Sequence, residues 1–408
     1  MNWNNLDVES SDKKEEILKK LIQIEKILRE KSSGKNTNPG LLGGKTGIAL
    51  FFLYYAKIMD RQEPYDHGLE LLSSVFDDIN SGFNYHTHAG GLAGIGSVIE
   101  ILSGKDFLEV DTNELLGELD NYLHELMIYE IKTGNYDFLH GAIGITFYFL
   151  VRTSNEKSHK YIAEFVSELD KIAVKDEQGI RWISEIGSEK HIKGYNLSLS
   201  HGLASIIAIL SKIYKVGIEK EKTLELLNGA VKYLLNQKLY DSKLYSLFPS
   251  WVSEGGTPTN SRLAWCYGDL GIGIALWLAG NNTNNSKWKE KAIEIVKHTT
   301  TRKEDENTGV VDAGLCHGSA GIAHIYNRMY NYTKKQEFKN SADYWLNKTL
   351  EFAMHEDTLS GYKMFRTEEH GGPQEEFGFL EGIAGIGLMY ISAISDVEPA
   401  WDECLLLS

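Results

Sequence analysis

Three residues of this chain have the chemistry of metal ligands. Cys316 and His317 are adjacent in GLCHGSAGIA (314–323), and Cys266 lies in the similar stretch AWCYGDLGIG (264–273). Thiolate and imidazole form a donor set that suits Zn²⁺. The chain has only three cysteines, and the third, Cys404, lies in the C-terminal WDECLLLS outside this pattern. Whether the three candidate ligands meet depends on the elements that carry them.

A repeated motif supplies those elements. A Gly-x-x-Gly pattern that opens an apolar run occurs seven times, and only the fourth copy departs from it, with Ser205 in place of the second glycine. Such repeats indicate one structural unit used many times. The intervals between the aligned glycines are 47, 50, 61, 66, 50 and 64 residues. The first glycines of the seven copies are Gly44, Gly91, Gly141, Gly202, Gly268, Gly318 and Gly382.

Each interval also holds an amphipathic helical pattern, for example at 13–30, 112–131, 222–238 and 287–300. The runs that follow the motif glycines are apolar on all sides, as expected for helices packed on both faces. We therefore predict an all-α protein of seven helical hairpins whose inner helices begin at the Gly-x-x-Gly motifs. Both ends of the array carry a full apolar motif, which favours a closed α/α toroid over an open solenoid with polar caps. The whole chain, 1–408, is predicted to be one such domain.

Equivalent positions in a closed ring point toward the same end of its axis. Cys266 and Cys316 both stand two places before the aligned glycine, in adjacent repeats, so we expect them to come close. His317 and His201 stand one place before it and belong on the same rim. Cys266, Cys316 and His317 would give zinc three protein ligands and leave one position open, as in catalytic zinc sites. Because two bound thiolates nearly neutralise the ion, activation of an incoming thiol is favoured over hydrolysis.

Composition narrows the class of protein. The chain has 408 residues and a formal net charge of −15, from 42 basic and 57 acidic residues, which argues against general affinity for nucleic acid or an anionic membrane. The polar N-terminus lacks the apolar core of a signal peptide, and no apolar run is long enough to span a bilayer. We expect a cytoplasmic protein with no integral membrane segment, associated with the membrane only peripherally through partners, if at all.

Five stretches together resemble the lanthionine synthetase C-like family, the cyclases of lanthipeptide biosynthesis, over nearly the whole chain. The resemblance implies an α/α toroid with one Zn²⁺ per chain, bound by Cys266, Cys316 and His317. It also implies addition of peptide cysteine thiols to dehydroalanine or dehydrobutyrine, which forms (methyl)lanthionine thioether rings. The stretches are SRLAWCYGDLGIG (261–273), GLCHGSAGIA (314–323), NLSLSHGLASI (196–206), YDFLHGAIGI (136–145) and GFLEGIAGIG (378–387).

The resemblance also implies catalytic residues and partners. His201 matches the position of a proton shuttle, and Asp137 that of a residue which helps deprotonate the thiol or orients a neighbour. Arg262 and Tyr267 match positions suited to stabilising the enolate charge. The implied substrate is a dehydrated precursor peptide with its leader, and the implied partners are a Ser/Thr dehydratase and an exporter. No fused dehydratase domain precedes the motifs, which favours a stand-alone cyclase.

Two other functions remain open from the sequence. One is a non-catalytic relative that binds thiols or peptides, and the other is a zinc-dependent protein prenyltransferase, although the motif positions supply little basic charge for a diphosphate. Among weaker signals, His86 and His88 form an H-x-H pair that we assign to a surface loop. The long connection 241–261 is either a packed loop or a segment that contacts the peptide. Nucleotide binding by GLLGGKTG (40–47) is disfavoured because Pro39 replaces the required glycine.

Overall fold

The computed structural model describes residues 3–6, 11–32, 38–186, 192–241, 243–253 and 255–408. The chain divides into two compact units. Unit 1 comprises residues 1–85, 89–91 and 310–401, and unit 2 comprises residues 86–88, 92–309 and 402–408. The single domain that we predicted over 1–408 stays a prediction.

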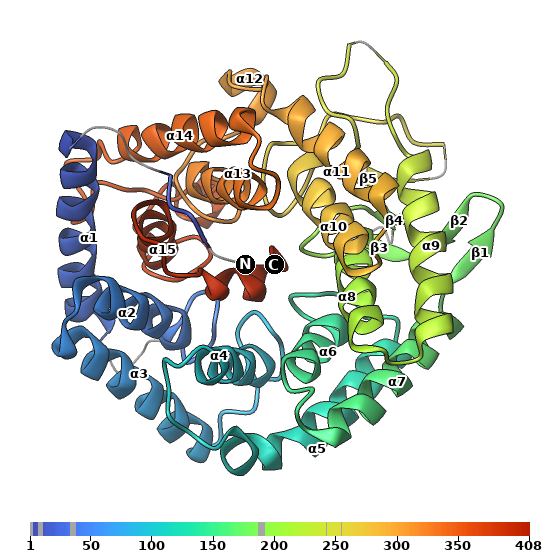
Figure 1. The fold of residues 1–408 in the computed structure, drawn as a ribbon, viewed down its shortest axis with the longest axis horizontal. Helices are drawn as coiled ribbons and strands as arrows, with labels where there is room; N and C mark the ends of the chain where they lie inside the picture. The colour runs from blue at the N-terminus through green and yellow to red at the C-terminus, as the bar shows by residue number, and fades with distance from the viewer. Residues whose placement is uncertain (1–2, 7–10, 33–37, 187–191, 242, 254) are drawn as a thin grey trace. The chain divides into compact units, whose positions relative to one another are not determined.

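Unit 1 is helical over most of its described residues. In it α2 packs on α3, α13 packs on α14, and α15 packs on both α1 and α2 (Figure 1). The last motif helix of the sequence is therefore a direct neighbour of the first. The helices are α1 (Ser11–Ser32), α2 (Lys45–Met59), α3 (Gln62–Asn80), α13 (Ser319–Thr333), α14 (Gln336–Glu351), the 3₁₀ helix η1 (Glu368–His370) and α15 (Ile383–Ile394).

Unit 2 contains the other motif helices and all the described strands. Helix α6 packs between α4 and α8, α8 packs on α10, and α5, α7, α9 and α11 each cover a motif helix. The helices are α4 (Leu92–Gly104), α5 (Thr112–Lys132), α6 (Ala142–Val151), α7 (Glu156–Lys171), α8 (Leu203–Val216), α9 (Lys220–Asn236), α10 (Asp269–Asn282), α11 (Ser286–Thr299) and α12 (Asp305–Thr308). The 3₁₀ helix η2 (Ala400–Leu405) begins at the end of unit 1, and its last four residues belong to unit 2. The strands are β1 (Val174–Asp176), β2 (Gly179–Arg181), β3 (Ser184–Ile186), β4 (Ile192–Asn196) and β5 (Trp251–Val252).

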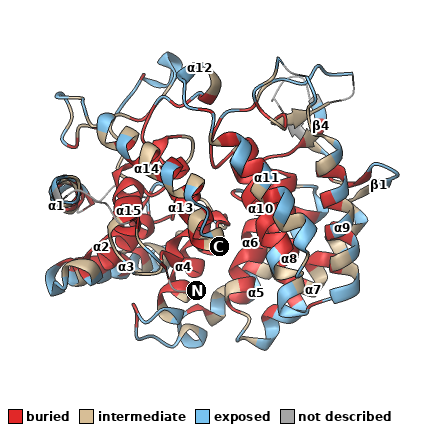
Figure 2. Ribbon diagram, turned by 45° about the horizontal axis from the view of Figure 1, so that its top comes forward, coloured by how far each residue is buried: buried red, intermediate tan, exposed pale blue. Residues whose placement is uncertain are grey.

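The motif helices form the buried layer of each unit. Helix α6 is buried from Ala142 to Leu150, and α2 is buried from Lys45 to Ala56. Their partner helices bury one face and expose the other, as Figure 2 shows for α7 and α11. The apolar motif runs and the amphipathic runs of the sequence thus correspond to these two kinds of helix.

The turns before the motif helices are joined by backbone hydrogen bonds between equivalent positions. In unit 1 the N–H of Cys316 donates to Leu380 O at 3.1 Å, that of Leu380 to Leu42 O at 2.9 Å, and that of Leu42 to Ala89 O at 2.8 Å. In unit 2 the N–H of Ser200 donates to Cys266 O at 3.4 Å. All these residues stand two places before an aligned glycine. In unit 1 the turn of one repeat therefore donates to the turn of the next, and the last repeat donates to the first. In unit 2 the fourth repeat donates to the fifth, whereas the Leu139 N–H of the third repeat bonds the Asp137 side chain.

The second motif glycine permits this close approach. A Cβ at Gly385 would collide with the carbonyl oxygen of Phe379 and come within 2.7 Å of the Leu315 side chain, which belongs to the preceding repeat. A side chain at this position would push neighbouring turns apart. In the fourth copy Ser205 replaces the glycine, is fully buried, and donates its hydroxyl to Gly202 O at 2.7 Å. The hydroxyl is satisfied inside α8, so the departure leaves the helix start intact.

The strands lie in the two connections that flank α8 and α9. Strands β1 and β2 form an antiparallel ribbon with Lys175 opposite Ile180, and β3, β4 and β5 form an antiparallel sheet in that order. In the sheet Ser184 pairs with Gly194, and Asn196 pairs with Trp251. The Trp251 indole packs so closely on Gly194 that no side chain fits at that glycine. This contact fixes the Trp251 ring beside the last residues before α8.

A buried carboxylate holds the long connection 241–261 to the start of α10. Asp269 is fully buried and accepts hydrogen bonds from the N–H groups of Leu247 at 2.9 Å and Phe248 at 3.0 Å. Its Oδ2 also lies 3.3 Å from Nη1 of Arg302, which is itself buried. Because Asp269 follows Cys266 by three residues, the same network fixes the turn that carries this cysteine.

We therefore expect Asp269→Ala to destabilise unit 2 strongly. The change leaves the Arg302 charge buried without its carboxylate and removes the acceptor of two amides, which costs about 3–5 kcal/mol. The measurement is the free energy of unfolding from urea titration followed by circular dichroism. Glu290→Ala, an exposed change on α11, is the control and should stay within about 0.5 kcal/mol of wild type. Equal effects of the two variants would contradict the assigned role of Asp269.

Candidate functional site

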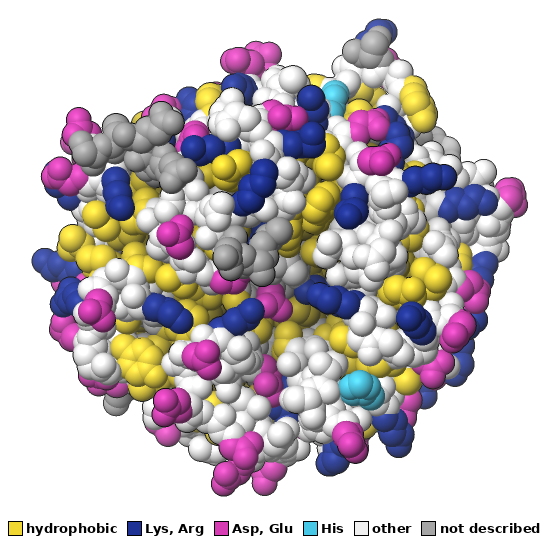
Figure 3. Space-filling view, viewed as in Figure 1, with side chains coloured by type: hydrophobic (Ala, Val, Ile, Leu, Met, Phe, Trp, Pro, Cys, Tyr) yellow, Lys and Arg dark blue, Asp and Glu magenta, His cyan; other side chains and the backbone are white. Residues whose placement is uncertain are grey.

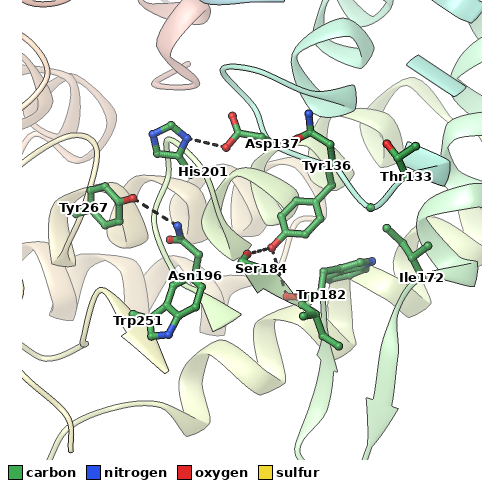
Figure 4. Close-up of a pocket in the computed structure, with 13 residues that line it drawn as sticks. Thr133, Tyr136, Asp137, Ile172, Trp182, Ser184, Asn196, His201, Trp251 and Tyr267 are labelled. Carbon is green, nitrogen blue, oxygen red and sulfur yellow. Dashed lines mark hydrogen bonds and ion pairs between the residues drawn. The ribbon is translucent and has the colours of Figure 1, made fainter. Parts of the chain in front are cut away.

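A histidine–aspartate pair lies in unit 2 at the turns that precede α6 and α8. Nδ1 of His201 is 2.7 Å from Oδ2 of Asp137 (Figure 4). The other oxygen of Asp137 accepts hydrogen bonds from the N–H groups of Leu139 at 2.7 Å and His140 at 2.8 Å. The His201 N–H donates to Ser198 Oγ at 3.0 Å. Hydrogen bonds within each turn therefore fix Asp137 and His201, and the approach of the two turns brings the two side chains together.

The hydrogen bond to Asp137 sets the protonation of His201. With the Nδ1 proton directed at the carboxylate, Nε2 is the nitrogen left to exchange a proton with a substrate. Burial alone would lower the pKa of His201, but the hydrogen bond and charge of Asp137, together with nearby Cys266, raise it above its ordinary value. The imidazolium form therefore persists to a higher pH than in an exposed histidine.

Tyr267 and His140 lie on either side of His201. The ring centroids of Tyr267 and His201 are 6.1 Å apart, and the His140 ring stacks on His201 at 5.9 Å. The Tyr267 hydroxyl accepts a hydrogen bond from Asn196 Nδ2 at 3.5 Å. Burial raises the pKa of Tyr267, so this hydroxyl keeps its proton at neutral pH and is a hydrogen-bond donor.

A cleft of about 750 Å³ opens beside the pair. In the view of Figure 4, His201 and Asp137 lie at the top of the cleft, Trp251 and Trp182 lie below them, and Tyr267 and Tyr136 lie at the left and right. Tyr136 donates to Trp182 O at 3.3 Å and forms a short hydrogen bond with Ser184, which joins the Asp137 turn to the edge of β3. The remaining lining residues are Thr133, Gly134, Asn135, Ile172, Ile183, Ser184 and Asn196.

Cys266 and Arg262 belong to the turn before α10, also in unit 2. Cys266 is 5% exposed, and its carbonyl accepts from the N–H of Leu199 at 3.1 Å and from that of Ser200. Arg262 is exposed and does not line the cleft. The structure therefore brings His201, Asp137 and Tyr267 together, whereas Arg262 lies apart from the cleft.

Cys316 and His317 belong to the turn before α13, in unit 1. Nε2 of His317 lies 3.2 Å from Oδ2 of Asp312, which is 2% exposed. Burial would raise the pKa of Asp312, but His317 and the N–H groups of Phe365 and Gly314 lower it, so this carboxyl is ionised. Cys266 lies in the other unit, and the meeting of all three candidate ligands stays a prediction.

Sequence reasoning missed Asp312 and Asn196, and it included Trp251 only as part of the connection 241–261. A usable signal exists for two of them, since Asp312 and Asn196 stand six places before an aligned glycine, as do Asn38 and Asn135. Extending the repeat alignment by four residues toward the N-terminus would have found a column with Asn or Asp in four of the seven repeats. Trp251 lies in a connection of unrepeated sequence, where no alignment between repeats applies.

One expectation was wrong. We assigned His88 to a surface loop, but its side chain is completely buried, with Nε2 2.8 Å from Cys404 O. Burial lowers the pKa of His88 to about 4, so the ring is neutral. The Cys404 thiol is also buried, and burial raises its pKa far above the usual range. This histidine is therefore a core residue that binds the C-terminal segment. His86 lies nearer the surface, with Nε2 2.8 Å from Glu130 Oε1.

The surface carries charges of both signs. On the face in Figure 3, Lys and Arg side chains are interspersed with Asp and Glu. This face is therefore mixed in charge rather than uniformly basic. Within the described ranges, no helix has the length and apolar character needed to cross a membrane.

Comparison with known proteins places the chain in a family. The pattern of the lanthionine synthetase C-like proteins matches residues 35–406. "Nisin biosynthesis protein NisC" of Lactococcus lactis subsp. lactis is 24% identical over 421 aligned positions, which cover 94% of each protein. The solved structure of a "Nisin cyclase" has a TM-score of 0.72 at 20% identity, and the alignment covers 94% of this chain and 96% of that one.

The structural match shows the fold. It confirms the predicted class, an all-α protein of the α/α-toroid type. The family match extends from before the first motif glycine to beyond the last motif helix. The chain belongs to the lanthionine synthetase C-like family.

Proposed function

We propose that this protein is a zinc-dependent lanthipeptide cyclase. It adds cysteine thiols of a dehydrated precursor peptide to dehydroalanine or dehydrobutyrine and so forms (methyl)lanthionine rings. The observation that carries the proposal is the His201–Asp137 pair at one end of a cleft, in a member of this family. The relatives named for nisin biosynthesis and cyclisation support the same reaction.

The proposed zinc ligands are Cys266, Cys316 and His317. The residues fit the ion because two are thiols and because His317 has a buried carboxylate, Asp312, behind it, an arrangement typical of metal-binding histidines. In four pairs of successive repeats, the turn of one repeat donates a backbone hydrogen bond to the equivalent turn of the next. The same rule applied to the fifth and sixth repeats would pair the turns of Cys266 and Cys316. The bound ion would lower the pKa of a substrate thiol and hold it as a nucleophilic thiolate.

Residues of the protein carry out the proton transfer that the addition requires. The thiolate attacks Cβ of the dehydro-residue, a C–S bond forms, and the electron pair of the double bond moves into an enolate. The substrate thiol releases its proton to solvent before the attack, and the Nε2–H of the His201 imidazolium donates a proton to Cα. The imidazole then regains a proton from solvent, so the thioether forms without change of mass. Asp137 stabilises the imidazolium and fixes its orientation. The Tyr267 hydroxyl is placed to donate to the enolate oxygen, and Arg262 is proposed to approach it when the peptide is bound.

We propose that the cleft binds the peptide residues next to those that react. It extends from His201 to Trp251 and Ile183, and these two side chains offer apolar surface, Ile183 being 45% exposed. Asn196 and Ser184 supply polar groups along the same wall. A peptide segment with an apolar side chain next to the reacting residue suits this lining.

Cyclisation is the decisive measurement. Incubation with a dehydrated, leader-bearing precursor should remove free thiols without any change of mass, detected by thiol alkylation and mass spectrometry. Wild-type protein should contain about one zinc per chain, and Cys316→Ala should lose most of the metal and the activity. Cys404→Ala is the matched control and should keep both. Persistence of all thiols with the cognate peptide would favour a binding protein, and full zinc in Cys316→Ala would overturn the ligand assignment.

Substitutions in the His201–Asp137 pair should impair proton transfer and leave the zinc content unchanged. His201→Ala is expected to lower kcat by about 10²–10⁴-fold with zinc content unchanged, because proton donation is lost. His140→Ala, which removes only a stacked ring, should have a much smaller effect. Equal losses in the two variants would remove the special role of His201.

The pH profile tests the same pair independently. Because Asp137 raises the pKa of His201, the imidazolium donor is present below that pKa, and activity should decline as pH rises through it. Asp137→Asn removes the raising charge, so this alkaline decline should move to lower pH, with a loss of kcat at every pH. If activity of Asp137→Asn declines at the same alkaline pH as in the wild type, the assignment of His201 as the proton donor is contradicted.

Peptide contacts in the cleft should appear in KM. Trp251→Ala and Ile183→Ser should each raise KM for the precursor several-fold and leave kcat nearly unchanged, because they remove apolar contact away from His201. Trp251→Phe should recover most of the loss. Tyr240→Ala, which removes an aromatic ring that is 87% exposed and outside the cleft, is the control. If KM stays at the wild-type value in both cleft variants, the peptide binds elsewhere.

A further inference from the structure

The residue six places before the motif glycine closes a turn in several repeats. Oδ1 of Asn38 accepts from the N–H of Gly40 at 2.6 Å, and Oδ1 of Asn196 accepts from that of Ser198 at 2.9 Å. In the sixth repeat, Oδ1 of Asp312 accepts from the N–H of Gly314 at 3.0 Å. An asparagine therefore suffices for this turn, as expected for an Asx turn. The turn alone does not account for a carboxylate at position 312.

The second carboxylate oxygen of Asp312, Oδ2, explains why an aspartate stands at position 312. Oδ2 lies 3.2 Å from Nε2 of His317 and accepts a hydrogen bond from the N–H of Phe365 at 2.9 Å. Both oxygens are thus directed by the fold, one toward the turn and the other toward the imidazole. The side chain is almost wholly buried, so solvent does little to screen its charge.

The arginine that follows Phe365 in the chain is engaged with other carboxylates. Arg366 Nη2 lies 2.6 Å from Glu381 Oε2 and 3.0 Å from Glu376 Oε1. The contacts described for Asp312 are therefore with His317 and with backbone N–H groups. Its negative charge acts on the imidazole rather than closing an ion pair with Arg366.

We propose that Asp312 is a positioning residue that orients His317 and strengthens it as a metal ligand. The inference rests on the zinc site of the proposed function. With Nε2 turned to the carboxylate, a metal bound by His317 takes Nδ1. The carboxylate fixes the ring and, by accepting the Nε2 proton, makes Nδ1 a better donor. The turn before α13 thus supplies Cys316, His317 and the group that supports His317.

The test measures metal affinity rather than activity. Zn²⁺ affinity is determined by competition with a chelator, and Co²⁺ substitution reports the ligand geometry by its absorption spectrum. Asp312→Asn preserves the turn oxygen and should lower Zn²⁺ affinity about 10–100-fold. Asn38→Asp, which makes the reverse exchange at the equivalent turn of the first repeat, should leave the affinity unchanged.

A double-mutant cycle separates positioning from general damage to the turn, including the loss of the acceptor for the Phe365 N–H. If Asp312 acts through His317, then Asp312→Asn should have almost no further effect on Zn²⁺ affinity in a His317→Ala background. The same fold-loss in both backgrounds, or no loss in either, would overturn the proposal. If wild-type protein binds no zinc through its cysteines, the proposed function fails instead, and the two failures are distinct.

Discussion

Close contact between equivalent turns of successive repeats is the constraint that organises both units. Backbone hydrogen bonds of about 3 Å make this contact in unit 1 and between the fourth and fifth repeats, the His201–Asp137 bond makes it between the third and fourth, and the second motif glycine leaves room for it. Once the turns are held so closely, residues just before the glycines are gathered whatever their separation in sequence. His201 and Asp137 are 64 positions apart, yet the Nδ1 to Oδ2 distance is 2.7 Å. The apolar motif helices form the buried layer of each unit, so the residues of the turns can differ in type from one repeat to another.

That freedom explains why the turns differ in chemistry while the helices do not. Two imidazoles, His201 and His317, occupy the same position in different repeats, and each has a buried or half-buried carboxylate behind it. Asp137 reaches its histidine from the preceding repeat, whereas Asp312 reaches His317 within one turn. In both cases backbone N–H groups hold the carboxylate. The proposed proton donor and the proposed metal ligand are therefore built by the same physical device.

The sequence was enough to predict the helices and much of the site, because repetition made equivalent positions visible. The motif glycines directly precede α2, α4, α6, α8, α10, α13 and α15. The imidazole–carboxylate pair of His201 and Asp137 followed from the family resemblance, and its geometry came only with the structure. His88 was misjudged because a short polar segment resembles a surface loop, while its burial depends on the C-terminal segment more than 300 residues away. Such a contact leaves no local pattern.

The unequal spacing of the motifs shows which connections between repeats are enlarged. The intervals that end at Gly202 and Gly268 are 61 and 66 residues, against 47 and 50 for the two that precede them. Within the described residues, all five strands lie in these two intervals, including β5 with Trp251, and most of the cleft lining comes from the same two connections. Insertions in a repeat array commonly collect on the binding face. Because the helices must keep the spacing of the turns, new contacts for a substrate can be added only in the connections. Two of the three longest intervals therefore lie on both sides of His201, where the cleft opens, and the third, of 64 residues, ends at Gly382.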